Sequence, residues 1–182
     1  RRDKMELDTV IKKRRSIRKY KNQTVDKKLI KQIIEAGIEA PSWKNSRTAR
    51  YHIITSKEIL DAFKNNCLPL FNQENCKDAP VLIVTTFIKN RSGFERDGTA
   101  SNELANGWGC YDLGLHNQNM ILKATELGLS TLIMGIRDEN KIREMLNIPA
   151  EETIVSVIAL GYKDIEVDRP KRKSVDDICK FY

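Results

Sequence analysis

The sequence has only two histidines, His52 and His116, and none of its four cysteines forms a C-x-x-C pair. Neither histidine stands at zinc-ligand spacing from a cysteine, and neither has an evident carboxylate partner nearby in the sequence. A G-x-S-x-G elbow, a P-loop and a G-x-G-x-x-G fingerprint are also missing. These absences argue against hydrolytic and other side-chain acid–base catalysis, and they predict no metal site.

Long apolar runs are missing too, since none approaches the roughly 20 residues that a membrane-spanning helix needs. The N-terminal Arg-Arg-Asp-Lys is not followed by the apolar core of a secretory signal. The cysteines stand apart from one another, which is typical of reduced thiols, although their even number leaves disulfides open. We therefore expect a cytoplasmic protein that has no membrane association.

The chain of 182 residues is 40% hydrophobic and 31% charged, which predicts one soluble domain over residues 1–182. Its net charge of +7 is compatible with nucleic acid or with an anionic cofactor. Basic residues are denser at 12–21 and 169–173, but acids lie among them and no RNA-binding aromatic motif is present. A basic nucleic-acid-binding module is therefore the minority hypothesis, and we expect no nucleic acid partner.

Periodicity predicts a mixture of helices and about four strands. Asp26, Ser56 and Asp138 are predicted N-caps, and Gly128 is predicted to end the longest helix in a left-handed conformation. The pattern does not alternate strictly, so it favours an α+β sandwich with helices on both faces of one sheet. The predicted helices are 5–14, 26–40, 56–66, 108–127 and 138–148, and the predicted strands are 51–55, 80–87, 130–135 and 154–160.

Several local expectations accompany this pattern. Leu7, Val10 and Ile11 are spaced to form one buried helix face, which Arg14 would continue. Residues 72–78 are predicted to be a loop. The polar residues 89–103 are predicted to be a mobile loop, either a lid over a site or a plain surface excursion. Asn117 and Asn119 interrupt the longest helix and predict packing against another helix or a cofactor, whereas Gln118 is predicted to face outward.

The segment Arg14-Arg15-Ser16-Ile17-Arg18 places three guanidinium groups and a hydroxyl within five residues. Planar guanidiniums bind phosphate bidentately, so such a cluster suits a terminal phosphate dianion. The alternative is a solvated basic run at a helix C-terminus, where cations also interact favourably with the helix dipole. With no catalytic acids in the sequence, the cluster indicates a protein that holds an anionic cofactor and leaves the chemistry to it.

Four segments together resemble the nitroreductase family of FMN-dependent oxidoreductases, in an order and spacing that hold from about Glu6 to Phe181. They are Arg14-Arg15-Ser16-Ile17-Arg18-Lys19-Tyr20, Ala40-Pro41-Ser42-Trp43-Lys44-Asn45-Ser46, Gly128-Leu129-Ser130-Thr131 leading to Met134-Gly135, and Pro170-Lys171-Arg172-Lys173. The resemblance implies an α+β sandwich with a mainly antiparallel central sheet. It also implies a homodimer with two FMN molecules at the subunit interface.

The resemblance also implies which residues bind the cofactor. By it, Arg14, Arg15, Ser16 and Arg18 contact the FMN phosphate and the ring edge. The turn reaches the flavin from the other subunit, through Pro41, Ser42, Trp43 and Asn45. Ile133, Met134 and Gly135 lie against the flavin ring, and the C-terminal pair returns to the phosphate through Lys171 and Arg172. The chain departs from the family pattern after Ser46, where Arg47-Thr48-Ala49 stands in place of Gln-Pro-Trp. Arg47 is still assigned to the flavin site, with a possible role in selecting an anionic substrate.

The implied activity is a ping-pong reaction in which NADH or NADPH reduces FMN and an oxidised small-molecule acceptor then takes the electrons through flavin N5. An arginine near the N1–C2=O edge would stabilise the negative charge of the reduced flavin. Nitroaromatics, quinones and activated alkenes suit an open flavin face, and Trp43 with the 89–103 loop would shape the pocket. A specialised role on the same fold, dehalogenation or flavin processing, is the alternative.

Overall fold

The structure is a computed structural model that describes residues 5–182. Its centre is a four-stranded sheet in the order β1-β2-β4-β3, with every neighbouring pair antiparallel. The strands are β1 (Ala49–Ile54), β2 (Val81–Ile88), β3 (Ser130–Met134) and β4 (Glu152–Gly161). The two central strands, β2 and β4, are buried along almost their whole length, as their near-continuous apolar sequences predict.

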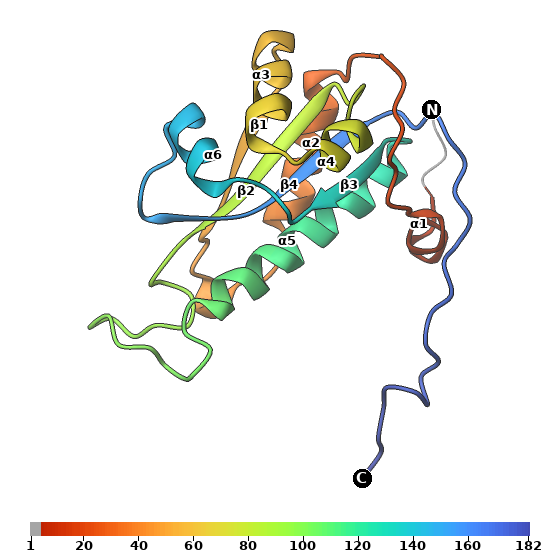
Figure 1. Ribbon diagram of the computed structural model, residues 1–182. Coiled ribbons are helices and arrows are strands. Elements are labelled where there is room, and N and C mark those ends of the chain that lie inside the picture. Colours follow the sequence, from red (N-terminus) through yellow and green to blue (C-terminus); the bar gives the residue numbers. More distant parts are fainter. Residues whose placement is uncertain (1–4) are drawn as a thin grey trace.

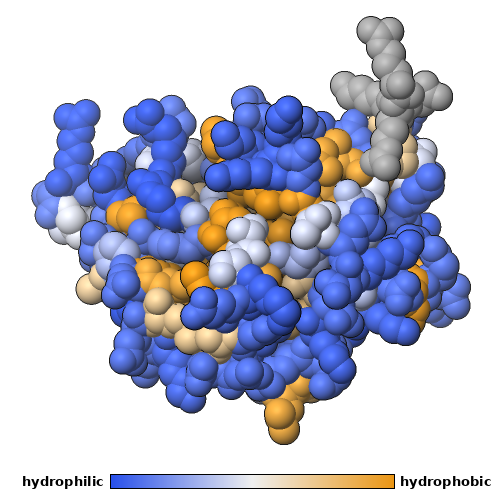
Figure 2. Space-filling view, turned by 90° about the horizontal axis from the view of Figure 1, so that it is seen from above, coloured by the Kyte–Doolittle hydropathy of each residue, from blue (hydrophilic) through white to orange (hydrophobic). Residues whose placement is uncertain are grey.

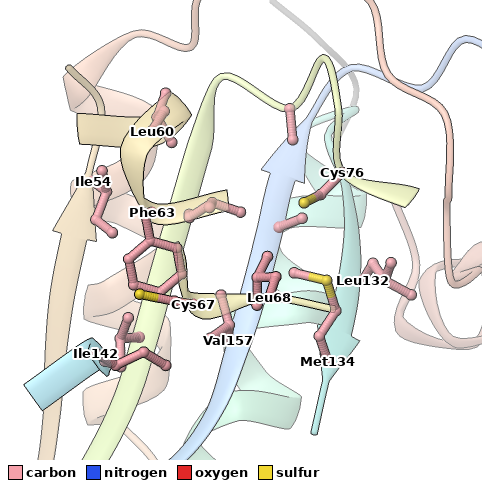
Figure 3. Packing of buried hydrophobic residues seen from close by; sticks show 14 of the residues in the cluster. Ile54, Leu60, Phe63, Cys67, Leu68, Cys76, Leu132, Met134, Ile142 and Val157 are labelled. Atoms are coloured by element: carbon pink, nitrogen blue, oxygen red, sulfur yellow. The ribbon is translucent and has the colours of Figure 1, made fainter. Parts of the chain in front are cut away.

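Helices cover both faces of this sheet (Figure 1), so the predicted α+β sandwich is confirmed. One face packs against two helices that also contact each other, and the other face against three shorter ones. The first pair is α2 (Lys27–Ile38) and α5 (Gly107–Glu126), and the second set is α3 (Lys57–Cys67), α4 (Leu70–Asn75) and α6 (Glu139–Leu146). Figure 3 shows the second core, where Phe63, Cys67 and Ile142 pack over Val157 of β4.

The close packing of α2 on α5 depends on a glycine. A Cβ at Gly37 would fall 2.7 Å from the Met120 Cγ of α5, so a larger residue would push the two helices apart. Asn119 strengthens the same contact, because its Nδ2 donates to the Ala36 carbonyl at 3.2 Å. The sequence analysis predicted that the amides in the longest helix mark packing against another helix, and this is correct for Asn119. Gln118 faces outward, as predicted.

The helix ends follow the predicted chemistry at most positions. The side chains of Asp26 and Asp138 accept N-cap bonds from Lys28 N and Lys141 N. Gly128 adopts φ +77°, which ends α5 as predicted. Ser56 occupies the N-cap of α3, but its hydroxyl makes no capping bond.

Three local predictions were wrong. Residues 70–75 form α4, where a loop had been expected from 72 onward. Only Val10 is buried in α1 (Leu7–Lys13), while Leu7 and Ile11 are 64% and 51% exposed. The helix lies at the periphery against α5, so one row of side chains is covered rather than a whole face. Arg14 does not continue the helix either, because its ψ of 129° takes the chain into an extended conformation.

The surface follows the composition. Polar and charged residues cover most of the face seen in Figure 2, and apolar residues show there in smaller groups between them. Among residues 5–182, no helix combines the length and the apolar character needed to cross a membrane. All four cysteines are free thiols, with Cys67 and Cys76 buried and Cys110 and Cys179 exposed.

Candidate functional site

The arginine segment lies along the outer edge of the sheet. Ile17 N donates to the Thr131 carbonyl at 3.0 Å, and Ser16 forms a parallel bridge with Thr131 of the edge strand β3. Ile17 is 2% exposed and anchors the segment in the core. Side chains alternate along an extended chain, so Ser16 and Arg18 on either side of Ile17 face away from the core. The parallel register also brings Arg18 level with Ile133.

Three guanidiniums gather at the end of α1. Arg15 donates to the carbonyls of Lys12 at 2.6 Å, Arg14 at 2.8 Å and Val167 at 3.3 Å, which fastens the C-terminal tail beside α1. The pKa of Arg14 lies below its ordinary value because of burial first, and then because of the positive charges of Arg172 and Arg15. Arg172 of the C-terminal tail is therefore close enough to Arg14 for their positive charges to interact.

No carboxylate in the described part of the chain forms an ion pair with Arg14, Arg15, Arg18 or Arg172. Like charges that approach one another without a counter-ion raise the free energy of the folded state. A cavity of about 450 Å³ adjoins this cluster, lined by Arg15, Lys12, Lys13 and the start of β3. Its one acid, Glu166, is paired with Lys163 at 2.6 Å. The cluster therefore has the charge of an anion site.

The end of β3 opens onto solvent. Ile133 is 48% exposed although it lies in the sheet, and a Cβ at Gly135 would meet nothing within 4 Å. Met134 differs from its neighbours, because it is 2% exposed and packs in the core under α3 and α6. At the end of β3 the Ile133 side chain, rather than Met134, is therefore accessible to a ligand.

The second predicted segment, Pro41–Arg47, forms a tight turn around the short 3-10 helix η1 (Trp43–Asn45). Lys44, Asn45 and Arg47 have φ values of +47°, +54° and +53°. Left-handed conformations cost free energy for residues other than glycine and asparagine, so the surrounding contacts must hold this turn. One of these contacts is internal, since Ser42 Oγ accepts a hydrogen bond from Arg47 N at 3.2 Å.

Asp112 of α5, which is 3% exposed, fixes the turn from below. Its Oδ2 accepts from Trp43 N at 3.0 Å and from Ser92 Oγ at 2.6 Å. Because the Ser92 hydroxyl gives its only proton to the carboxylate, Ser46 Oγ must donate to Ser92 Oγ across 2.6 Å. One buried carboxylate thus orders hydroxyls from both the turn and the following loop.

The 89–106 loop is folded rather than open. Ser101 N donates to the Gly93 carbonyl at 2.8 Å, and Lys44 pairs with Glu95 at 3.1 Å. Trp43 is half-buried, because its ring lies 4.7 Å from that of Trp108. Tyr111 meets Trp108 edge-on at 5.5 Å and is 60% exposed. The loop and the turn thus form one assembly at the start of α5.

The two halves of the predicted site lie far apart in one chain. The turn enters β1 at Ala49, which pairs with Phe87, whereas the arginine segment lies beside Thr131, which pairs with Leu160. Leu160 pairs with Val81 at the opposite end of β2. Trp108, which contacts Trp43 of the turn, and Thr125, which lines the cavity beside Arg15, stand at the two ends of α5. They are about 25 Å apart along the helix axis.

Sequence reasoning missed several residues that the structure brings to the turn. Asp112 and Ser92 stand in segments that had been interpreted as a plain helix and a polar loop. Tyr51 and Arg50 of β1, together with His116 of α5, line a cavity beside the turn. Of these residues, His116 is buried, at 7% exposed. No pattern in the sequence signals these positions, because their partners are distant along the chain.

The residues just described can be compared with known proteins. The model of the nitroreductase family matches residues 11–162. A protein of Methanothermobacter thermautotrophicus, provisionally named an NADH dehydrogenase/NAD(P)H nitroreductase, is 31% identical over 166 residues, covering 87% of this chain and 78% of its own length.

Solved structures agree on the fold. A nitroreductase family protein of Streptococcus pneumoniae superposes with a TM-score of 0.85 at 20% identity, covering 97% of this chain and all of the other. A structure described as an oxidoreductase containing FMN superposes with a TM-score of 0.74 at 22% identity, covering 91% and 81%. The family match spans most of the sheet and both of its helical layers, and on that ground this chain belongs to the nitroreductase family.

Proposed function

We propose that this protein is an FMN-dependent oxidoreductase that uses NADH or NADPH to reduce nitroaromatics, quinones or similar acceptors. One observation carries the proposal: Arg14, Arg15 and Arg172 gather beside the start of β3 and have no carboxylate partner in the described part of the chain. The family match supports it, as do the name of the archaeal relative and the description of the FMN-containing structural neighbour.

The residues of the site fit both ends of an FMN molecule, its phosphate and its flavin ring. The guanidiniums of Arg14, Arg15 and Arg172 suit a phosphate dianion, to which arginine donates paired hydrogen bonds. Lys171 adjoins Arg172 in the tail and adds positive charge. Ile133 and the open space at Gly135 offer an apolar, uncrowded surface for a planar ring, while Ser16 and Arg18 point outward beside it.

FMN, when bound, supplies hydride transfer through its N5, and we propose that the nucleotide product leaves before the acceptor enters, as in a ping-pong reaction. For a nitro group the overall two-electron balance is R–NO₂ + NAD(P)H + H⁺ → R–NO + NAD(P)⁺ + H₂O. The chain's own contribution is to hold the phosphate and to place a cation near the ring. A fixed positive charge favours the reduced, more anionic ring.

A second copy of this chain completes the site in this proposal. The turn of Pro41, Ser42, Trp43, Asn45 and Arg47 lies across the molecule from the arginine segment. In a two-fold dimer every contact between the two copies occurs twice. If the arginine segment of one copy faces the turn of the other, the reverse pairing forms as well, and there are two such sites. FMN would then lie at the subunit interface, between the arginine segment of one protomer and the turn of its partner.

The first test is an absorbance spectrum of the purified protein before and after denaturation. We expect flavin bands and the release of about one FMN per chain. Arg14→Ala should raise the Kd for FMN about tenfold or more, because hydrogen bonds to charged groups contribute about 1.5–3 kcal/mol. Arg96→Ala, an exposed residue of the 89–106 loop outside the arginine cluster, is the matched control. A colourless protein that does not bind added FMN would contradict the proposal and return attention to the basic nucleic-acid module.

A further inference from the structure

A cavity of about 580 Å³ lies beside the Pro41–Arg47 turn, between α2, β1 and α5. One wall is apolar and is formed by Ile34 and Ile38 of α2 and Ile53 of β1. Ser42, Asn45 and Arg47 of the turn also line the cavity. The cavity is large enough for a small aromatic molecule, and the apolar wall would cover the body of such a ligand.

The charged side chains among the lining residues of this cavity are all cationic. Arg47 and Arg50 line it, and no carboxylate does. Arg50 Nη1 donates to the Arg47 carbonyl at 3.0 Å and to the Ala49 carbonyl at 2.8 Å, which holds the two residues side by side. Neither guanidinium forms an ion pair with a carboxylate within residues 5–182. The site therefore favours a ligand that brings negative charge.

Two further residues of the lining carry buried polar atoms without a hydrogen-bond partner. These atoms are Tyr51 Oη and His116 Nδ1. His116 is 7% exposed, so its imidazole is buried against the cavity, and its Nδ1 has no hydrogen-bond partner within residues 5–182. Buried polar groups are normally hydrogen-bonded, and the exceptions concentrate where a ligand or a water completes the set. Their presence in the same cavity as two unpaired arginines points to a ligand-binding role.

We propose that this cavity binds the anionic group of the electron acceptor, and that the acceptor is an aromatic or similarly apolar molecule carrying a carboxylate. Arg47 would bind the carboxylate, Arg50 beside it would add positive charge, and the isoleucines would pack against the apolar body. The inference rests on the proposed function, because it takes the turn to be part of the flavin site. It assigns a role to Arg47, where the chain departs from the family pattern.

The test compares ligands that differ only in charge. Benzoate and benzamide, which are not reduced, are titrated calorimetrically against the flavin-loaded full-length protein. Benzoate should bind at least about tenfold more tightly, and its affinity should fall as salt is raised, since exposed charges are screened. Arg47→Gln and Arg50→Gln should each remove most of this preference. Arg96→Gln, which lies outside the cavity, should retain it.

A kinetic measurement separates failure of this inference from failure of the proposed function. The ratio of kcat/KM for 4-nitrobenzoate to that for 4-nitrobenzamide should fall about tenfold in Arg47→Gln and Arg50→Gln. Oxidation of NADH or NADPH with benzoquinone, which is neutral, reports the general activity, and the FMN content of every variant is measured alongside. Normal turnover of benzoquinone with equal binding of benzoate and benzamide would overturn the inference alone. Absence of flavin and of all turnover would overturn the proposed function.

Discussion

Glu152, at the start of β4, has a buried carboxylate with two hydrogen-bond partners on neighbouring strands. Its Oε2 accepts from Thr86 Oγ1 at 2.5 Å and lies 2.8 Å from His52 Nε2, and the residue is 7% exposed. Burial pushes its pKa upward, but the hydrogen bonds from Thr86 and His52, with the charges of His52 and Arg50, leave the pKa below the ordinary glutamate value. The ionised form is therefore the one that the fold stabilises.

This arrangement predicts an acid-sensitive contribution to stability. A carboxyl whose pKa is lowered on folding stabilises the protein above its unfolded-state value, and the contribution is lost as the pH falls through the folded-state pKa. The free energy of unfolding of Glu152→Gln should therefore depend less on pH below about pH 4.5, near the ordinary glutamate pKa. Urea unfolding at a series of acidic pH values measures this, with the exposed neighbour Glu151→Gln as control. Equal pH dependence in both variants would contradict the assignment.

The roles of single residues, in the fold as in the candidate site, were predictable only where local chemistry determines them. Asp26, Asp138 and Gly128 were identified because capping depends on the residue type and its immediate neighbours. Asp112 was not identified, because its partners Trp43 and Ser92 come from other parts of the chain. The arginine segment was found because several guanidiniums in a row form an unusual pattern in themselves.

Among the elements, α5 shows how a glycine allows close packing, because the absence of a side chain leaves room for a neighbouring ring. Gly109 faces the ring of Phe87, and a Cβ there would fall 2.2 Å from Phe87 Cε2. Phe87 is 1% exposed and cannot move toward solvent. Gly114 lies on the same helix, but a Cβ there would meet nothing within 4 Å.

The two glycines should therefore respond to alanine in opposite directions. Gly109→Ala should destabilise the protein by about 1–3 kcal/mol through overpacking against the phenylalanine ring. Gly114→Ala should be neutral or stabilise the protein by up to about 1 kcal/mol, because alanine has a higher helix propensity than glycine at an exposed position. Denaturant midpoints of the two variants measure the difference. Stabilisation by both would show that α5 can shift away from β2.

At this scale the sequence predicted most elements, with ends that differ from the structure by a few residues. The buried strands β2 and β4 and the helix α5 have long periodic or continuous apolar patterns, and these were recognised. The six-residue α4 was missed because it is too short to show a helical period, and its polar sequence resembles a loop. The prediction of a buried face on α1 was wrong because tertiary packing decides how much of a peripheral helix is covered, and periodicity does not show this.

The whole molecule separates the two predicted halves of the site, and this separation can be tested directly. Arg14→Ala would impair the arginine segment and Asn45→Ala the turn. In a two-fold dimer with shared sites, a heterodimer of the two variants contains one site with both defects and one intact site. Differently tagged chains, co-expressed and purified as the mixed dimer, should therefore bind about half as much FMN as the wild type. Each single-variant homodimer should bind weakly.

Two outcomes would contradict a shared site. If each site is formed by one chain alone, the mixed dimer should bind FMN no better than the average of the two homodimers. If the chain remains a monomer at all concentrations by light scattering, the turn cannot be supplied by a partner. The expectation of a shared site came from the family resemblance alone, because periodicity and local motifs in one chain carry no information about how two subunits would assemble.

The bridge between Ser16 and Thr131 also has a consequence for self-association. An uncovered edge strand is a template on which further strands can add, and a sheet with two such edges can grow without limit. Here the arginine segment occupies the β3 edge at Thr131, whereas β1 has no segment paired to its outer side within residues 5–182. A strand from another molecule could therefore add at β1 without displacing any described part of the chain. Addition at Thr131 of β3 would first require residues 14–18 to leave their place.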